Sequence, residues 1–114
     1  MKFVMLIYQP PTFDPKQLPP EEQQRIGDEY GAISATRNVT PGLPLGFVKD
    51  ATTVQVVGTS TVTRDGPYVD AARAVGGYFV FDAETKEEAI ALAARVPAAR
   101  LGGAVEIRPA EVYW

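Results

Sequence analysis

Residues 76–82 have the sequence Gly76-Gly77-Tyr78-Phe79-Val80-Phe81-Asp82, and this stretch predicts more of the fold than any other. Aromatic and β-branched residues favour a strand, and strand alternation places Tyr78 and Val80 on one face and Phe79 and Phe81 on the other. Residues 3–8 are continuously apolar in the same way, and Pro10-Pro11 end that strand because proline cannot donate to a ladder. The sequence therefore predicts two strands that are buried on both faces.

The sequence predicts two helices, one before and one after the central part of the chain. Five prolines stiffen residues 9–20, and the first helix is predicted to start near Glu21, with Ile26, Tyr30 and Ile33 at helical spacing. In the second helix, Thr85 and Glu88 have the spacing of a capping box. Apolar residues then recur at helical positions until Pro97, which predicts the end of the helix there.

The remaining segments are predicted to be a loop, a hairpin and a last strand. Residues 38–50 contain Pro41-Gly42 and Pro44 and are expected to be a loop. Residues 53–57 and 61–64 are rich in Val and Thr and are expected to pair as a hairpin across Gly58-Thr59-Ser60. Residues 104–108 alternate between apolar and charged side chains, which predicts a strand with one solvated or cavity-facing side.

This order of elements predicts a single domain over residues 1–114 with an α+β fold, a ferredoxin-like sandwich with an added hairpin. Two helices cover only one face of such a sheet, so a second subunit is the simplest cover for the other. We therefore expect a homodimer. The expected contacts, whose face the alternation does not decide, are Phe3, Met5, Phe79 or Phe81, and the tail 112–114.

Composition excludes several classes of function. The chain has 114 residues, 46% of them hydrophobic, and its 14 acidic and 11 basic residues give a net charge of −3, so nucleic acid is not an expected partner. Cysteine and histidine are absent, which removes disulfides, thiolate nucleophiles and imidazole bases, and no metal site or cofactor is expected. No apolar run approaches the roughly 20 residues of a membrane span, so we expect a cytoplasmic protein without a membrane partner.

The candidate catalytic residue is Asp65, which begins the segment Asp65-Gly66-Pro67-Tyr68. An aspartate at this position commonly accepts hydrogen bonds in a turn, and that structural role competes with a functional one. The functional alternative is a carboxylate at the rim of a cavity, acting as a general acid or base. Candidate ligand-binding residues are the aromatic and cationic side chains of Tyr8, Tyr68, Arg73, Tyr78 and Arg108. For each of these tyrosines packing is the commoner role, and for Arg73 the commoner role is that of a surface cation.

The segments 64–70 and 76–82 together resemble the signature of the YCII-related superfamily, in the branch named for its Asp-Gly-Pro-Phe motif, with Tyr68 in place of the usual phenylalanine. The resemblance extends to residues 1–8, 51–56, 93–100 and 105–109. It implies a dimeric α+β barrel, in which two sheets close face to face. The chain departs from the branch at Ala71 and Ala72, and it lacks the histidine of the histidine and aspartate pair proposed for relatives.

Two functions follow as expectations. The first is a small-molecule-binding protein or cofactor-independent enzyme, because related barrels act on small organic substrates. The second is a noncatalytic regulatory or interaction module, because the branch resembles proteins encoded beside extracytoplasmic-function sigma factors in bacteria. A pocket with perturbed carboxylates and a dry interior favours the first, and a filled core with an exposed apolar patch favours the second.

Overall fold

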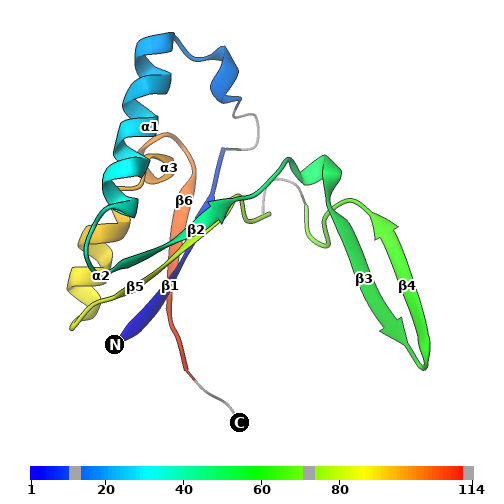
Figure 1. Cartoon of the computed structure of the whole chain (residues 1–114). Coiled ribbons are helices and arrows are strands. Elements are labelled where there is room, and N and C mark those ends of the chain that lie inside the picture. Colours follow the sequence, from blue (N-terminus) through cyan, green and yellow to red (C-terminus); the bar gives the residue numbers. More distant parts are fainter. Residues whose placement is uncertain (11–13, 71–73, 112–114) are drawn as a thin grey trace.

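The structure, a computed structural model, describes residues 1–10, 14–70 and 74–111. Its centre is a four-stranded antiparallel sheet in the order β2-β5-β1-β6 (Figure 1). The strands are β1 (Lys2–Tyr8), β2 (Val39–Pro44), β5 (Gly77–Asp82) and β6 (Ala104–Pro109). The strands predicted at residues 3–8, 77–82 and 104–108 are confirmed as β1, β5 and β6. Of these, β1 and β5 are the two central strands.

The helices begin where the sequence predicts. Helix α1 (Pro20–Ser34) has Pro20 in its first turn, where a missing N–H costs no hydrogen bond. Helix α2 (Lys86–Ala93) is capped by Thr85, whose hydroxyl accepts a hydrogen bond from the Glu88 backbone N–H at 3.2 Å. Pro97 ends the pattern of α2 and opens a short helix, α3 (Pro97–Arg100). Two 3-10 turns, η1 (Pro15–Gln17) and η2 (Val48–Asp50), lie in the connections.

The strand order is that of a ferredoxin-like α+β fold, but its second strand comes from an unexpected segment. Residues 38–50 were expected to be a loop, and that prediction is wrong for β2, which pairs with β5. The prolines at 41 and 44 are tolerated because β2 is an edge strand, where one side of the backbone needs no ladder partner. The ladder also shifts register between Pro41 and Pro44, which is typical of a β-bulge.

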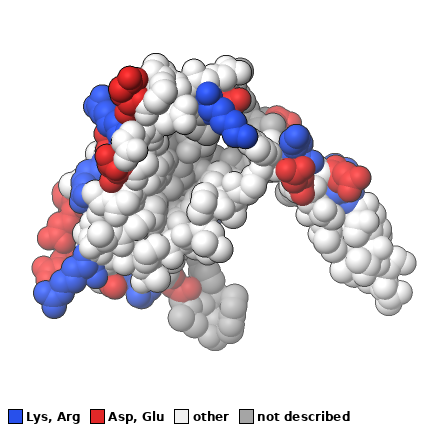
Figure 2. All heavy atoms as spheres, turned by 45° about the horizontal axis from the view of Figure 1, so that its top comes forward, with Lys and Arg blue, Asp and Glu red and all other residues white. Residues whose placement is uncertain are grey.

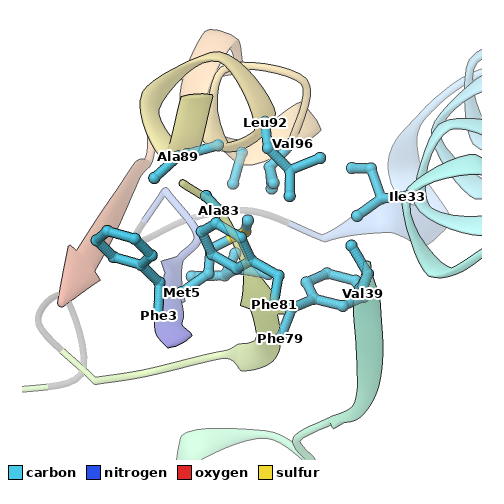
Figure 3. Packing of buried hydrophobic residues seen from close by; sticks show 13 residues of the cluster. Phe3, Met5, Ile33, Val39, Phe79, Phe81, Ala83, Ala89, Leu92 and Val96 are labelled. Carbon is cyan, nitrogen blue, oxygen red and sulfur yellow. The ribbon is translucent and has the colours of Figure 1, made fainter. Parts of the chain in front are cut away.

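The hydrophobic core lies between the helices and one face of the sheet. Phe3, Met5, Phe79 and Phe81 are at most 6% exposed, and the rings of Phe3 and Phe81 stack at 5.6 Å between centroids. Figure 3 shows these residues packed with Val39 of β2, Ile33 of α1, and Ala89 and Leu92 of α2. The expectation that Phe3, Met5, Phe79 or Phe81 would contact a second subunit is therefore wrong, because the chain's own helices cover them.

No helix of the described residues lies on the opposite face of the sheet, which we call the open face. Its residues on the central strands, which alternate with the core residues, are Val4, Leu6, Tyr8, Tyr78 and Val80. Tyr78 is 39% exposed and the other four are half-buried, so the central strands are not buried on both faces within one chain. Ion pairs flank these residues, between Lys2 and Asp82 at 3.4 Å and between Arg108 and Glu106 at 4.0 Å.

The predicted hairpin is confirmed and stands apart from the sheet. Strands β3 (Thr52–Val57) and β4 (Ser60–Asp65) pair with each other as a separate two-stranded sheet, joined by a tight turn in which Gly58 has φ of +62°. Figure 1 shows this hairpin projecting away from the helices, with its tip far from the four-stranded sheet. We call residues 52–65 the arm. Every residue of the arm except Thr53 is exposed.

Candidate functional site

A cavity of about 290 Å³ lies between α1 and the ends of β1, β2 and β5. Helix α1 contributes Tyr30 and Ser34, and the end of β1 contributes Ile7 and the following Gln9. The rest of the lining comes from the facing ends of β2 and β5, at Gly42, Leu43, Pro44, Gly76, Gly77, Tyr78 and Phe79. The volume lies near the lower limit of typical small-molecule sites.

The bulge and the glycines explain why this space is open. Between Pro41 and Pro44, β2 takes one more residue than β5 to cover the same length of ladder, so its end bends away from the sheet. A Cβ atom on Gly42 would lie 2.7 Å from the Tyr78 ring, so only glycine lets the ring rest against β2. A Cβ atom on Gly77 would meet Ile7, Leu43 and Pro44 at 3.8–4.0 Å, which is ordinary contact inside the cavity. Gly77 therefore leaves room that a side chain would fill.

The polar groups of the cavity are neutral. The Gln9 side-chain amide donates to the phenol oxygen of Tyr30 at 3.3 Å. Burial raises the pKa of the Tyr30 phenol above its ordinary value of 10.0, and hydrogen bonds with Gln9 and the Ala98 backbone only partly oppose this effect. The phenol therefore stays protonated at ordinary pH. Because Gln9 already donates to its oxygen, the Tyr30 O–H is available to donate to a ligand.

No charged residue lines the cavity among the residues that the structure describes. The charged groups that act on Tyr30 are Glu29 and Arg100, which join α1 to α3 through two hydrogen bonds. The hydrogen bond and charge of Arg100 hold the pKa of the Glu29 carboxyl below its ordinary value. This pair neutralises itself, and the described lining residues supply neither a carboxylate for acid–base chemistry nor a cation for an anionic ligand.

The candidate ligand-binding residues do not form one cluster. Tyr78 lines the cavity. Tyr8 lies on the same side of the sheet as Tyr78, one strand away, and Arg108 lies on that side of β6, where it pairs with Glu106. Tyr68 is 70% exposed and does not line the cavity, and Arg73 lies outside the described residues.

The candidate catalytic residue Asp65 is the exposed last residue of β4, at the base of the arm. Gly66, with φ of +104°, donates its backbone N–H to the Ala51 carbonyl at 2.7 Å, and Thr53 donates its hydroxyl to the Gly66 carbonyl at 2.8 Å. The Asp65 carboxylate makes no hydrogen bond or ion pair in the described part of the chain. A second hollow of about 310 Å³ nearby includes Pro67 and Asp50 in its lining, but not Asp65.

Three polar residues of the cavity are not among the sequence-predicted ligand-binding residues: Gln9, Tyr30 and Ser34. Tyr30 has helical spacing with Ile26 and Ile33, and this spacing predicts a packing residue rather than a binding residue. A sequence signal that could have indicated the cavity is the polar Gln9, which directly follows an apolar strand. The bulge that opens the cavity lies in β2, the strand that the sequence pattern does not predict.

The described ranges contain neither a membrane-spanning helix nor a cluster of metal-ligating side chains. No helix within them is long and apolar enough to cross a membrane. In those same ranges, no three His, Cys, Asp or Glu side chains gather in a way that could hold a metal ion.

Comparison with known proteins identifies the family. A search of curated proteins found no match. The YCII-related domain family matches residues 1–111, which is nearly the whole sequence and includes every strand and helix described above. With this match over the ferredoxin-like sheet, its helices and the arm, the chain belongs to the YCII-related domain family.

Proposed function

We propose that the chain is a small-molecule-binding protein whose ligand occupies the cavity beside Tyr30. The observation that carries the proposal is the pairing of an uncharged, mostly apolar lining with one neutral phenol that can donate a hydrogen bond. An uncharged aromatic or cyclic molecule with a carbonyl or ether oxygen fits this lining. Such a ligand leaves its apolar body against Ile7 and Phe79 and directs its oxygen to Tyr30.

This proposal favours binding over acid–base catalysis. The carboxylate that the sequence suggests for such chemistry, Asp65, lines neither hollow. We place the chain in the Asp-Gly-Pro-Phe branch of the family, a proposal that rests on residues 64–70 and their resemblance to the branch motif.

The test compares two probes of nearly equal shape, naphthamide and naphthoate, by isothermal titration calorimetry. We expect the neutral amide to bind at least about tenfold more tightly, because the anion loses its hydration and meets no cation among the described lining residues. Tyr30→Phe should weaken amide binding about fivefold through the loss of one hydrogen bond. Equal affinity for both probes would contradict the proposal.

A matched pair of glycine variants locates the binding. Gly77→Ala places a methyl group inside the cavity without a steric clash and should weaken amide binding. Gly46→Ala adds the same methyl group where no atom lies within 4 Å, outside the cavity lining, and should leave binding unchanged. Equal effects of the two variants would place the ligand elsewhere.

We also propose that the chain forms a homodimer through the open face. Two features support this proposal: the apolar row on β1 and β5, and the flanking pairs Lys2–Asp82 and Glu106–Arg108, which carry no net charge. A neutral, apolar surface suits an apolar surface of a second copy, and about a twofold axis the open face of each copy is covered in the same way.

The alternative function is a noncatalytic interaction module of the kind that the sigma-factor resemblance implies. The observation that favours it is the arm, with Val54, Val56, Val57 and Val62 each 47–67% exposed.

A further inference from the structure

The arm is unusual for a surface element because it carries no charge along most of its length. Residues 51–63 contain no Lys, Arg, Asp or Glu, and the charged pair Arg64 and Asp65 lies at its base. Figure 2 shows the arm as an uncharged projection, with charged side chains gathered where it joins the body and over the helices. A solvent-exposed hairpin normally relies on charged side chains to remain soluble and unpaired.

The arm is also apolar on both of its faces. Register places Val54 opposite Thr63 and Val56 opposite Thr61 on one face, and it places Val62 opposite Gln55 on the other. These three valines are 59%, 67% and 47% exposed, respectively. A two-stranded hairpin alone in water is at best marginally stable, so an arm of this kind needs a surface to pack on.

The two edge strands of the four-stranded sheet, unlike the arm, carry features that prevent pairing with another chain. Edge strand β2 carries Pro41, Pro44 and the bulge, and edge strand β6 carries Glu106 and Arg108 and ends at Pro109. Prolines, bulges and charges are the usual devices that keep an edge strand from pairing with another chain. Strands β3 and β4 contain no proline, and their only charged residues, Arg64 and Asp65, lie at the base of the arm. The arm therefore lacks the protection that the main sheet has.

The base of the arm is held in a defined conformation. Besides the bonds of Gly66 to Ala51 and Thr53, the Arg64 guanidinium donates to the Pro67 carbonyl at 3.0 Å. These bonds fix how the arm leaves the body, and they leave its two strands clear of the four-stranded sheet (Figure 1). Figure 2 shows a hollow between the body and the arm.

We propose that the arm of each chain lies in the hollow between the body and the arm of a second copy, against the open face of that copy's four-stranded sheet. This inference rests on the homodimer proposed above and adds the element that holds it together. Each copy has one uncharged arm and one uncovered apolar face, so two copies clasped about a twofold axis cover both elements in both chains. One face of each arm then meets the partner's sheet, and the other face meets the partner's arm.

The size of this contact suits a stable dimer. The arm has two six-residue strands, to which the residues of the open face are added. Together they approach the roughly 20 residues that each partner contributes to an interface of standard size. The open face alone contributes fewer residues than an interface of standard size.

The first test uses the unmodified protein. Amide hydrogen exchange of residues 52–65 is measured at chain concentrations far below and far above the dimer dissociation constant given by sedimentation. We expect exchange of the arm amides to slow at least about tenfold in the dimer, because packing on the partner suppresses opening of the hairpin. Arm amides that exchange equally fast in monomer and dimer would overturn the inference.

The second test uses matched charge variants in the arm. Val56→Lys and Val62→Lys place a charge on opposite faces of the arm, and each should raise the dissociation constant about 100-fold. Thr59→Lys places the same charge in the turn at the tip and should change it less than about threefold. Equal effects of all three variants would overturn the inference.

The third test removes the arm by joining Thr52 to Asp65, which face each other in the ladder, through two glycines. The core contains no arm residue, so we expect a folded chain with unchanged helical circular dichroism and a dissociation constant raised at least about 100-fold. If the armless chain dimerises as tightly as the full chain, the role of the arm is refuted and the homodimer stands. If the full chain is monomeric at every concentration, both proposals are refuted.

Discussion

At the residue scale, Tyr30 shows how its surroundings decide what a side chain can do. The same phenol in water is a donor and an acceptor, but beside Gln9 its oxygen already accepts a hydrogen bond. Burial keeps it protonated, so its remaining role in the cavity is that of a donor. The sequence predicts the position of Tyr30 on a helix, but not the cavity beside it, because that space depends on a bulge in a different strand.

Glu29 leads to a prediction about pH. Its folded-state pKa lies below the ordinary value of 4.5, chiefly because Arg100 donates hydrogen bonds to it. The Glu29–Arg100 pair therefore contributes its full stability above that ordinary value, and this contribution is lost as pH falls through the lower, folded-state pKa. We expect the difference in Tm between the wild type and Glu29→Gln to shrink as pH falls from about 6 to about 3. Thermal melts by circular dichroism measure it, and a difference that stays constant would contradict this assignment.

For Asp65 we predict that substitution has almost no effect on stability or on ligand binding. Its carboxylate is exposed and makes no bond within the described residues, so Asp65→Asn should change the free energy of unfolding by less than about 0.5 kcal/mol. Binding of naphthamide should also be unchanged, because Asp65 lies outside the cavity lining. Urea denaturation and calorimetry measure the two effects. A loss of binding at unchanged stability would instead restore Asp65 as a functional residue.

At the scale of elements, local signals predicted the helices and the hairpin well, because caps, prolines and turns act within a few residues. The start of α1 follows from Pro20, and the start of α2 follows from Thr85. Strand β2 was missed because its prolines are compatible with a strand only at a sheet edge, and edge position is a property of the whole sheet. The candidate cavity depends on that strand and was missed with it.

The cap of α2 leads to a prediction about stability. Thr85 accepts a hydrogen bond from the Glu88 backbone, and the Glu88 carboxylate accepts one from the Glu84 backbone at 3.0 Å. Thr85→Ala should lower the free energy of unfolding by about 1 kcal/mol, whereas Thr85→Ser should lower it by much less, because serine keeps the accepting oxygen. Urea denaturation of both variants measures the difference. Equal losses would show that the threonine methyl group, rather than the cap, is responsible.

At the scale of the whole molecule, the ferredoxin-like fold was predicted, but the face of the sheet that the helices cover was not. Strand alternation separates Phe79 and Phe81 from Tyr78 and Val80, and this separation is confirmed. Alternation cannot decide which of two apolar faces meets the helices, since both faces carry apolar side chains. The structure answers this, because the bulky Phe3, Met5, Phe79 and Phe81 fill the space under α1 and α2.

The open face leads to a prediction about assembly. Leu6 lies at its centre, opposite Tyr78 on β5 and Glu106 on β6. Leu6→Lys should raise the dimer dissociation constant at least about 100-fold, because the interface would have to bury an unpaired charge. Ile90→Lys is the control, since Ile90 is 49% exposed on α2, on the opposite side of the sheet. Analytical ultracentrifugation measures both variants, and a Leu6→Lys chain that dimerises like the wild type would contradict the proposed interface.

The position of β1 in the sheet has a consequence for how the chain folds during synthesis. β1 is made first, yet both of its neighbours, β5 and β6, begin at residues 77 and 104. Strand β1 therefore lacks its partner β5 until residues 77–82 have been made and its partner β6 until residues 104–109 have been made, whereas the arm closes locally within microseconds. Because pairing of distant segments limits the folding rate, completion of the sheet around β1 is the slow, late step. Throughout that interval the apolar segment 3–8 is exposed to other nascent chains.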